Sequence, residues 1–442
     1  MSWRKTVSWS LSVAAAVSLA GCGGGGGVSQ GDQGVKSGDV KDLASSNEPV
    51  TITFYRPNNA TTEDEFNKLM GDAIKAKFPN VTPKFIPYDK NVGIDGVITS
   101  GNDIDIMLLS IAFLPQFPNY KLQMDHTDLI KKYNFDLNRL EPTMVEYMKN
   151  FSSGGMYALP IFTTAETLIY NKDLFDKFGV PYPKDGMTWD ETYELAKKMT
   201  RVEGGTQYYG LMMSTSHMMR TNQLGLPYVD IKTNTPQIAT DSFRRLIENY
   251  TRFYMVPGAE LKDKKPNELD LFTKSRTLAM YAYFNSAMIA APEDMNLDAV
   301  TLPTFNEAPG TGSQMYPTYA GVVSSSKNKE AAFQILAYLT SEEMQLKFAK
   351  DGTGLPVIKN SEKIVAAFGE SKPQLKGKNI RAFYPAKPAP IPQRNVYEDL
   401  ADKQLNAAFT EVILGKSDVN SALRKANEQA AKDIEAAKAA AK

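Results

Sequence analysis

The sequence contains few of the residues on which most catalytic and metal sites depend. One cysteine and two histidines, His126 and His217, occur among 442 residues. A single thiol excludes an internal disulfide, and two imidazoles are too few for most zinc sites. The 50 lysines and arginines are balanced by 50 aspartates and glutamates, so the chain lacks the basic charge typical of nucleic-acid-binding proteins. Neither a cofactor nor a nucleic-acid partner is therefore expected.

Several motifs of common enzyme families are missing as well. The chain has no H-E-x-x-H or C-x-x-C pattern, and the phosphate-loop pattern is present only as its second half in "LGKSD", Leu414 to Asp418. That stretch is interpreted as a turn between two helices. Since no pair of nucleophile and base can be assembled from recognisable motifs, we expect a protein that is not an enzyme. A surface hydrolase is the less favoured alternative.

Two short stretches raise the hypothesis of a metal site. Asp103 and Asp105 in "GNDIDIMLL" could offer carboxylate oxygens, but Asp105 enters an apolar strand and is expected to cap or pair locally. His217 lies in "SHMMR" beside two methionines, yet adjacent positions of a regular element cannot converge on one ion. We therefore expect core or surface methionines at this place and no bound metal.

The amino-terminal segment carries a targeting signal. Two basic residues precede an apolar run that ends at Leu19, which is too short to span a bilayer and is typical of a signal peptide. The following "LAGC" resembles the lipobox of bacterial lipoproteins, which implies cleavage before Cys22 and a diacylglycerol on its sulfur. Residues 1–21 are interpreted as a lipoprotein signal peptide. Residues 22–48, polar and rich in glycine, are interpreted as the lipidated cysteine and a flexible linker.

The rest of the chain alternates strands and helices. "VTITFY", Val50 to Tyr55, is a β-branched strand, and Thr62 with Glu65 three residues later marks a capped helix start. Thr188 and Glu191 have the same spacing. This alternation favours a parallel sheet covered by helices, and the chain is too long for a single hydrophobic core. The sequence therefore predicts an α/β protein with two bodies.

Four stretches, in order, resemble a known family. They are "LIYNKDLF" followed by "TWDE", then "FTKSRTLAMYAYFN", "YAGVVSSSKNKEAAFQILAYLTSEEMQLKFAKDGTGLPV" and "AFTEVILGKSDVNSALRKANEQ". Together with the lipobox they are similar to the extracellular solute-binding proteins of ABC importers, in the group around the maltose- and oligosaccharide-binding proteins. The resemblance covers most of residues 48–435. It implies two α/β lobes, each a mainly parallel sheet flanked by helices, with a ligand cleft between them.

The resemblance also implies where the chain passes between the lobes. Crossings are expected near Phe162 to Thr167, near Tyr319 to Val322 and near Thr353. The first lobe would consist of residues 49–162 and 320–352, and the second of residues 163–319 and 353–442. A cleft between two bodies that close on a few hinge residues suits a small-molecule site.

Aromatic residues at the family's cleft positions are the main binding candidates, because sugars stack on aromatic faces. Beyond the predicted signal peptide the only tryptophan is Trp189, which belongs to a helix start and is expected to pack in a core. The aromatic candidates are Tyr55, Phe162, Tyr283, Phe284, Tyr319 and Tyr397, each of which could instead pack in a core. The polar candidates are Arg56, Ser110, Thr163, Glu166, Asn285 and Arg394.

The sequence thus predicts a lipid-anchored solute-binding protein on the extracytoplasmic face of the cell membrane. It would bind a sugar or oligosaccharide by lobe closure and deliver it to the permease subunits of an ABC importer. It is expected to be a monomer that contacts the membrane only through its lipid. The lack of a tryptophan for the cleft leaves a polyamine, a phosphorylated compound or a metal chelate open as ligands. Presentation of the ligand state to a receptor is a further alternative.

Overall fold

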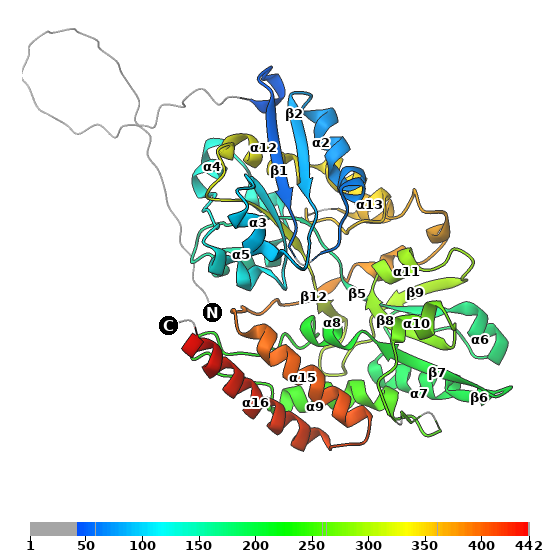
Figure 1. Ribbon diagram of the computed structural model, residues 1–442. Coiled ribbons are helices and arrows are strands. Elements are labelled where there is room, and N and C mark those ends of the chain that lie inside the picture. Colours follow the sequence, from blue (N-terminus) through cyan, green and yellow to red (C-terminus); the bar gives the residue numbers. More distant parts are fainter. Residues whose placement is uncertain (1–41, 58, 259, 262, 360, 441–442) are drawn as a thin grey trace, which may run out of the picture. The chain divides into compact units, whose positions relative to one another are not determined.

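The computed structural model describes residues 42–57, 59–258, 260–261, 263–359 and 361–440 (Figure 1). The predicted signal peptide, Cys22 and the linker up to residue 41 lie outside the described residues. The described part of the chain contains two five-stranded sheets, each flanked by helices, as the sequence predicted. None of its helices combines the length and the apolar character needed to cross a membrane.

The first sheet has the strand order β2-β1-β3-β11-β4. Its strands are β1 (Val50–Tyr55), β2 (Val81–Ile86), β3 (Ile106–Ser110), β4 (Leu159–Phe162) and β11 (Thr318–Val322). We call this sheet and its helices the first lobe. The helical segments are η1 (Leu43–Ser45), α1 (Glu63–Phe66), η2 (Asn67–Gly71), α2 (Asp72–Lys77), α3 (Gly93–Thr99), η3 (Leu114–Tyr120), α4 (Thr127–Lys132), η4 (Leu137–Arg139), α5 (Pro142–Phe151), α12 (Lys329–Leu339), α13 (Glu342–Lys350) and α14 (Glu362–Ala366).

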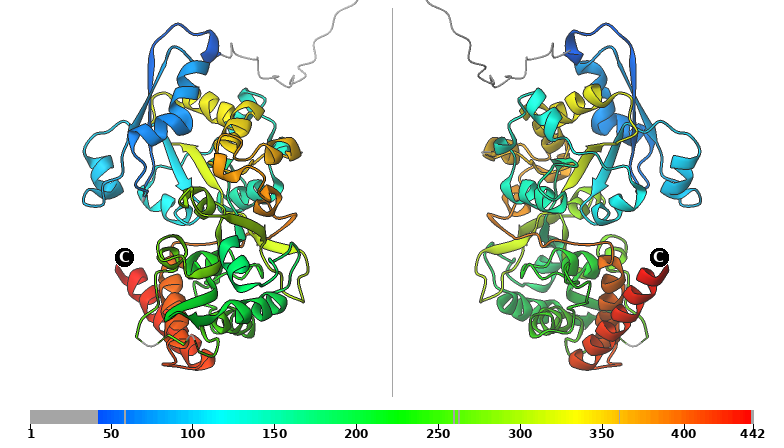
Figure 2. Two further views of the ribbon diagram at one scale, coloured as in Figure 1. Left: turned by 90° about the vertical axis from the view of Figure 1, so that its right-hand side faces the viewer. Right: turned by 90° about the vertical axis from the view of Figure 1, so that its left-hand side faces the viewer.

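The second sheet has the strand order β6-β7-β8-β5-β9. Its strands are β5 (Glu166–Asn171), β6 (Arg201–Glu203), β7 (Thr206–Met213), β8 (Leu278–Phe284) and β9 (Leu297–Thr301). We call this sheet and its helices the second lobe. The helices are α6 (Lys172–Phe178), α7 (Trp189–Met199), α8 (Thr215–Arg220), α9 (Asp241–Thr251), η5 (Arg252–Tyr254), α10 (Glu268–Thr273), α11 (Ser286–Ala290), α15 (Glu398–Ile413) and α16 (Val419–Ala440). Figure 2 shows the paired helices α15 and α16 on this lobe.

A two-stranded parallel sheet and two short helical turns complete the described elements. Its strands are β10 (Thr311–Gln314) and β12 (Lys387–Ala389), and the turns are η6 (Pro373–Leu375) and η7 (Ile380–Phe383). The stretch "LGKSD" connects α15 to α16, which confirms its interpretation as a turn between helices.

The sheets are more mixed than the prediction of mainly parallel sheets. In the first, β1 is parallel to β2 and β3, whereas β11 is antiparallel to β3 and β4. In the second, β7 and β8 are parallel, whereas β5 is antiparallel to β8 and β9, and β6 to β7. The reason lies in the crossings between lobes. β5 and β11 are the first strands after a crossing, so each begins at the edge of the sheet that faces the other lobe. The strands that end at this edge therefore run in the opposite direction.

Two crossings differ from their expected positions. β4 ends at Phe162 and β5 begins at Glu166, within the range expected for the first crossing. The second crossing lies between β10 and β11, just before Tyr319, because Tyr319 to Val322 already belong to the first sheet. The third lies after Thr353. Leu355 still exchanges backbone hydrogen bonds with Thr163, and the Lys359 N–H donates to the Arg139 carbonyl of the first lobe.

Both predicted capping boxes are present. The Thr62 Oγ1 accepts a hydrogen bond from the Glu65 N–H, and the Glu65 carboxylate accepts one from the Thr62 N–H. Thr188 and Glu191 repeat this arrangement at the start of α7. Each box satisfies two backbone N–H groups that the first turn of a helix leaves without partners.

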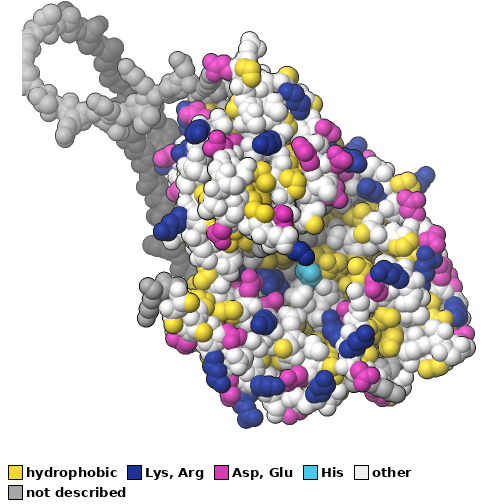
Figure 3. Space-filling view, in the orientation of Figure 1, with side chains coloured by type: hydrophobic (Ala, Val, Ile, Leu, Met, Phe, Trp, Pro, Cys, Tyr) yellow, Lys and Arg dark blue, Asp and Glu magenta, His cyan; other side chains and the backbone are white. Residues whose placement is uncertain are grey.

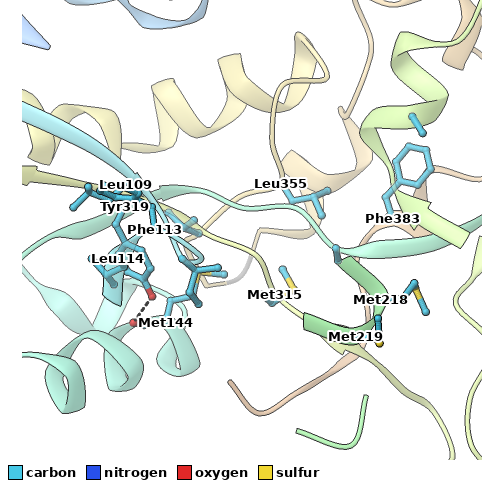
Figure 4. Close-up of a cluster of buried hydrophobic side chains, with 14 of the residues drawn as sticks. Leu109, Phe113, Leu114, Met144, Met218, Met219, Met315, Tyr319, Leu355 and Phe383 are labelled. Carbon is cyan, nitrogen blue, oxygen red and sulfur yellow. Dashed lines mark hydrogen bonds between the residues drawn. The ribbon is translucent and has the colours of Figure 1, made fainter. Parts of the chain in front are cut away.

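The prediction that Trp189 packs in a core is confirmed. Its side chain is buried, its Nε1–H donates to the Gln223 Oε1 at 2.9 Å, and the rings of Tyr250 and Phe253 contact it edge to face. Buried apolar side chains also continue from the first lobe into the second. Figure 4 shows this band, which includes Leu109, Phe113, Leu114, Met144, Met218, Met219, Met315, Tyr319, Leu355 and Phe383.

Candidate ligand-binding site

The carboxyl ends of several strands from both lobes lie at the edge where the chain crosses. β1, β3 and β4 run in the same direction, so β1 and β3 end where β4 leaves the first lobe. β8 runs against β5, and β7 runs with β8, so both end where β5 enters the second lobe. The crevice beyond the carboxyl ends of strands is the usual ligand site of α/β proteins. Figure 3 shows the surface hollowed at this level, with a histidine and basic side chains beside it.

Four rings from three separate segments meet at this edge, and we call them the aromatic cluster: His217, Tyr283, Phe284 and Tyr316. The centroid of the His217 ring lies 5.2 Å from that of Tyr283 and 4.9 Å from that of Phe284. The Phe284 ring lies 5.0 Å from the ring of Tyr316. Aromatic pairs at these separations attract one another in tilted and edge-to-face arrangements. The cluster therefore joins the end of β8, helix α8 and the segment between β10 and β11.

Polar side chains of the first lobe reach the same cluster. Ser110 at the end of β3 and Arg56, directly after β1, both lie close enough to Tyr316 to interact with it electrostatically. The Arg56 guanidinium makes one long hydrogen bond, 3.4 Å to the Thr61 Oγ1. Tyr316 is thus a point of contact between the lobes.

A network of charged groups in the second lobe lies beside the cluster. The Arg220 guanidinium contacts the Asp399 and Asp402 carboxylates at 3.1 and 2.8 Å. Arg394 donates from Nη2 to the Arg220 carbonyl at 2.6 Å and to the Gln314 Oε1 at 3.1 Å. Its Nη1 is buried without a hydrogen-bond partner among the described residues. The charge of Arg220 is therefore compensated within the lobe, whereas Arg394 keeps unused donor capacity.

Glu166 is a buried carboxyl group at the start of β5. Its Oε1 accepts a hydrogen bond from the Thr221 Oγ1 at 3.2 Å, and its Oε2 has no partner among the described residues. Burial raises the pKa of Glu166 to about 8, and the hydrogen bond from Thr221 opposes this shift only partly. The group is therefore protonated in neutral solution.

Replacing Glu166 with glutamine is expected to flatten the pH dependence of stability. The unfolded carboxyl titrates near 4.5 and the folded one near 8, so the contribution of Glu166 to stability is fully present below pH 4.5 and is lost as the pH rises toward 8. The slope is at most about 1.4 kcal/mol per pH unit. Urea unfolding at pH 5, 6.5 and 8 should show a steeper loss in wild type than in Glu166→Gln, in which the buried Glu398, with a pKa raised to about 7, still contributes. Identical slopes for the two proteins would contradict it.

The structure brings together some of the predicted binding residues. Arg56, Ser110, Tyr283 and Phe284 contribute to the aromatic cluster or lie beside it. Arg394 lies in the adjoining charged network. Asn285 follows Phe284 and accepts a hydrogen bond from the Thr164 Oγ1 at 2.5 Å, next to the first crossing.

Other predicted residues lie in the protein interior or on other contacts. Tyr55 and Tyr319 are fully buried, and the Tyr319 hydroxyl donates to the Met144 carbonyl at 3.0 Å (Figure 4). Thr163 is also fully buried. Phe162 packs edge to face against Phe348, and Tyr397 faces the Lys438 ammonium of α16. Tyr55, Thr163 and Tyr319 are therefore not exposed to a ligand in this structure.

Sequence reasoning missed two residues of the cluster, His217 and Tyr316. A usable signal was present for His217, because "SHMMR" begins three residues after the last residue of strand β7 and so lies near its carboxyl end. Tyr316 had no comparable signal, since its segment is irregular. Asp105 is paired within the protein, as expected, but with segments far away in the sequence and not locally. Its carboxylate accepts hydrogen bonds from the Thr53 N–H at 2.9 Å and the Ser326 Oγ at 2.6 Å.

A recess of about 870 Å³ lies next to the loop that follows Arg56. It is lined by residues 59–61 of that loop, by side chains of α1, η2 and α2, and by Lys347, Asp351 and Lys372. Its charges are mixed, and Lys347 is paired with Asp351 at 2.6 Å. None of its lining residues belongs to the aromatic cluster, and its link to that cluster is Thr61, which accepts the hydrogen bond from Arg56.

Comparison with known proteins identifies the class of protein. The family model described as bacterial extracellular solute-binding protein matches residues 59–346, and the chain belongs to this family. A binding protein of Brucella abortus (strain 2308) is 23% identical over 407 residues, which cover 85% of this chain and 90% of that protein. The sn-glycerol-3-phosphate-binding periplasmic protein UgpB of Brucella melitensis is 24% identical over 326 residues, which cover 66% of this chain and 70% of that protein.

A solved structure has the same fold. The ABC substrate-binding protein Lmo0181 from Listeria monocytogenes, in complex with cycloalternan, superposes with a TM-score of 0.69 at 20% identity. The match covers 88% of this chain and 100% of that chain. The two-lobed α/β architecture is therefore shared along nearly the whole described chain.

Proposed function

We propose that this protein binds a neutral polyhydroxylated solute, a sugar or an oligosaccharide, between its lobes and delivers it to the permease subunits of an ABC importer. The observation that carries the proposal is the aromatic cluster at the carboxyl ends of strands from both lobes. A ring face suits the apolar C–H face of a sugar, while the partly exposed Ser110 and Arg56 offer polar contacts to hydroxyl groups. The cycloalternan complex of Lmo0181 and the family membership support this choice.

Lobe closure supplies the means of signalling that the solute is bound. A solute that contacts both lobes stabilises the closed arrangement, whereas one that contacts a single lobe leaves the equilibrium unchanged. Tyr316 lies between the first-lobe Ser110 and the second-lobe Phe284, so a solute at the cluster touches both bodies. The protein performs no catalysis and acts as a monomer.

A phosphorylated solute is the second candidate. Among the described residues, the Arg56 guanidinium has one hydrogen bond, of 3.4 Å, and the Arg394 Nη1 has none. Guanidinium groups with free donors bind phosphate oxygens well. The similarity to UgpB, named for binding sn-glycerol 3-phosphate, supports this alternative.

A thermal-shift screen with maltotriose, ribitol, sn-glycerol 3-phosphate and spermidine tests the proposal. A solute at a hundredfold excess over its Kd stabilises the folded protein by about 2.7 kcal/mol, so a specific one raises Tm clearly. Stabilisation by maltotriose or ribitol supports the polyhydroxylated solute, and stabilisation by sn-glycerol 3-phosphate alone supports the second candidate. Stabilisation by spermidine alone would contradict both.

The proposed function includes attachment to the outer face of the membrane through a lipid on Cys22. The resemblance of "LAGC" to a lipobox supports it, and two acyl chains would hold the protein stably at a bilayer.

Replacing Cys22 with serine is expected to release the protein from the membrane. A serine hydroxyl does not receive the diacylglycerol, so more than about nine-tenths of the protein should move from the membrane pellet to the soluble fraction. Ser29→Ala, a similarly small change in the same linker, serves as the control and should stay in the pellet. Solute affinity should be the same for all three proteins. Cys22→Ser protein that remained with the membrane would exclude this anchor.

A further inference from the structure

The histidine of the aromatic cluster has one ring nitrogen bound and one free. His217 is the third residue of α8, which begins directly after β7 at the edge of the hollow. Its Nδ1 lies 2.7 Å from the Ser214 Oγ. Its Nε2 has no hydrogen-bond partner among the described residues. It also differs from the buried unpaired polar atoms of those residues, because it is accessible to solvent. The side chain is partly exposed, so Nε2 is open to the hollow.

The contact with Ser214 determines which ring nitrogen carries the proton. An imidazole nitrogen without a proton is a stronger acceptor than a hydroxyl oxygen, so Ser214 donates to the His217 Nδ1. A neutral imidazole that accepts at Nδ1 carries its proton at Nε2. Burial and the nearby Arg220 lower the pKa of His217 to about 4, which keeps the ring neutral.

We propose that His217 is a specificity-determining residue, held by Ser214 in the form with a proton on Nε2, and that this N–H donates a hydrogen bond to an oxygen of the bound solute. The inference rests on the proposed function, because it takes the solute to lie at the aromatic cluster. The first lobe adds Arg56, a second donor, near Tyr316. Donors from both lobes select hydroxyl, carboxylate or phosphate oxygens and disfavour ammonium groups. The site therefore rejects polyamines.

The proton position is tested on the ligand-free protein by NMR with ¹⁵N-labelled histidine. The two histidines are assigned by the signals that His217→Asn removes. The His217 spectrum at pH 7 should show a protonated Nε2 and an unprotonated Nδ1. Ser214→Ala should shift the equilibrium toward a mixture of both forms. A wild-type His217 protonated mainly at Nδ1 would overturn the assignment, whatever solute the protein binds.

The contact with solute is tested by a pair of amide variants. The amide of an asparagine occupies the place of Nδ1 and retains the contact with Ser214, whereas the amide of a glutamine reaches the place of Nε2. Calorimetric titration with maltotriose, ribitol and sn-glycerol 3-phosphate should show affinity reduced roughly tenfold in His217→Asn and within about threefold of wild type in His217→Gln. A purely structural role predicts the opposite order.

The failures of the two proposals are distinguishable. If a probe binds wild type and His217→Asn equally well, the His217 contact is excluded while the proposed function stands. If no probe binds wild type but the NMR spectrum shows the Nε2–H form, the proposed solute class fails, and the solute contact of His217 falls with it. Tm values of the ligand-free variants check that each protein is folded.

Discussion

Gly210→Ala is expected to abolish stable folding of the second lobe. A Cβ atom at this position of β7 would lie 2.0 Å from the Ala196 carbonyl oxygen and 2.6 Å from the Ala196 carbon atoms, all of them backbone atoms of α7. Side chains can rotate away from a clash, but a helix packed on the sheet can relieve this one only by separating from it. We therefore expect a loss of at least about 4 kcal/mol in the free energy of unfolding.

The measurement is the soluble yield, followed by urea unfolding of whatever soluble protein is obtained. Gly96→Ala is the matched control, because its new Cβ would approach only the exposed side chain of Val92, which can move. A helical glycine replaced by alanine gains up to about 1 kcal/mol of helix stability, so this variant should stay near wild type. Gly210→Ala protein as stable as Gly96→Ala would contradict the close packing of α7 on β7.

Phe284→Ala is expected to cause the second largest effect. Phe284 is 5% exposed and contacts the rings of His217, Tyr283 and Tyr316, so its removal opens a cavity beneath the aromatic cluster. A buried phenylalanine replaced by alanine costs about 3–5 kcal/mol. Since the cluster loses its central ring, solute affinity should fall as well.

Tyr283→Ala separates binding from stability. Tyr283 is partly exposed at the edge of the cluster, so its loss should reduce solute affinity with a smaller decrease in Tm than Phe284→Ala. Phe284→Leu, which fills most of the cavity, should recover most of the lost stability. Thermal unfolding and calorimetric titration of the three variants give both quantities. A lower Tm for Tyr283→Ala than for Phe284→Ala would show that Tyr283, and not Phe284, is the more important of the two for stability.

Local elements of the fold were predictable from the sequence because short-range chemistry determines them. The capping boxes at Thr62 and Thr188 each depend on two residues three positions apart. The position of Trp189 in a core was predictable for the same reason, since it is tied to a capped helix start. The resemblance added the two-lobed arrangement, which no local pattern contains.

The binding site was predictable only in part. Every position of β11 is buried, and so are the last four of β1, because helices cover both faces of the first sheet. In such a strand no alternation of polar and apolar residues shows which side chains face a ligand. Tyr55 and Tyr319 were therefore placed in the site although they are buried. Tyr316 and His217 were missed, because their meeting with Phe284 depends on how distant segments cross between the lobes.

The pairing of β3 with β11 also determines when the first sheet can fold. Leu109 pairs with Tyr319, so the middle of the first sheet remains open until nearly three quarters of the polypeptide has been made. Contacts between such distant segments form slowly, because a long loop must be closed before they stabilise anything. The first sheet of a growing chain therefore stays incomplete through most of its synthesis.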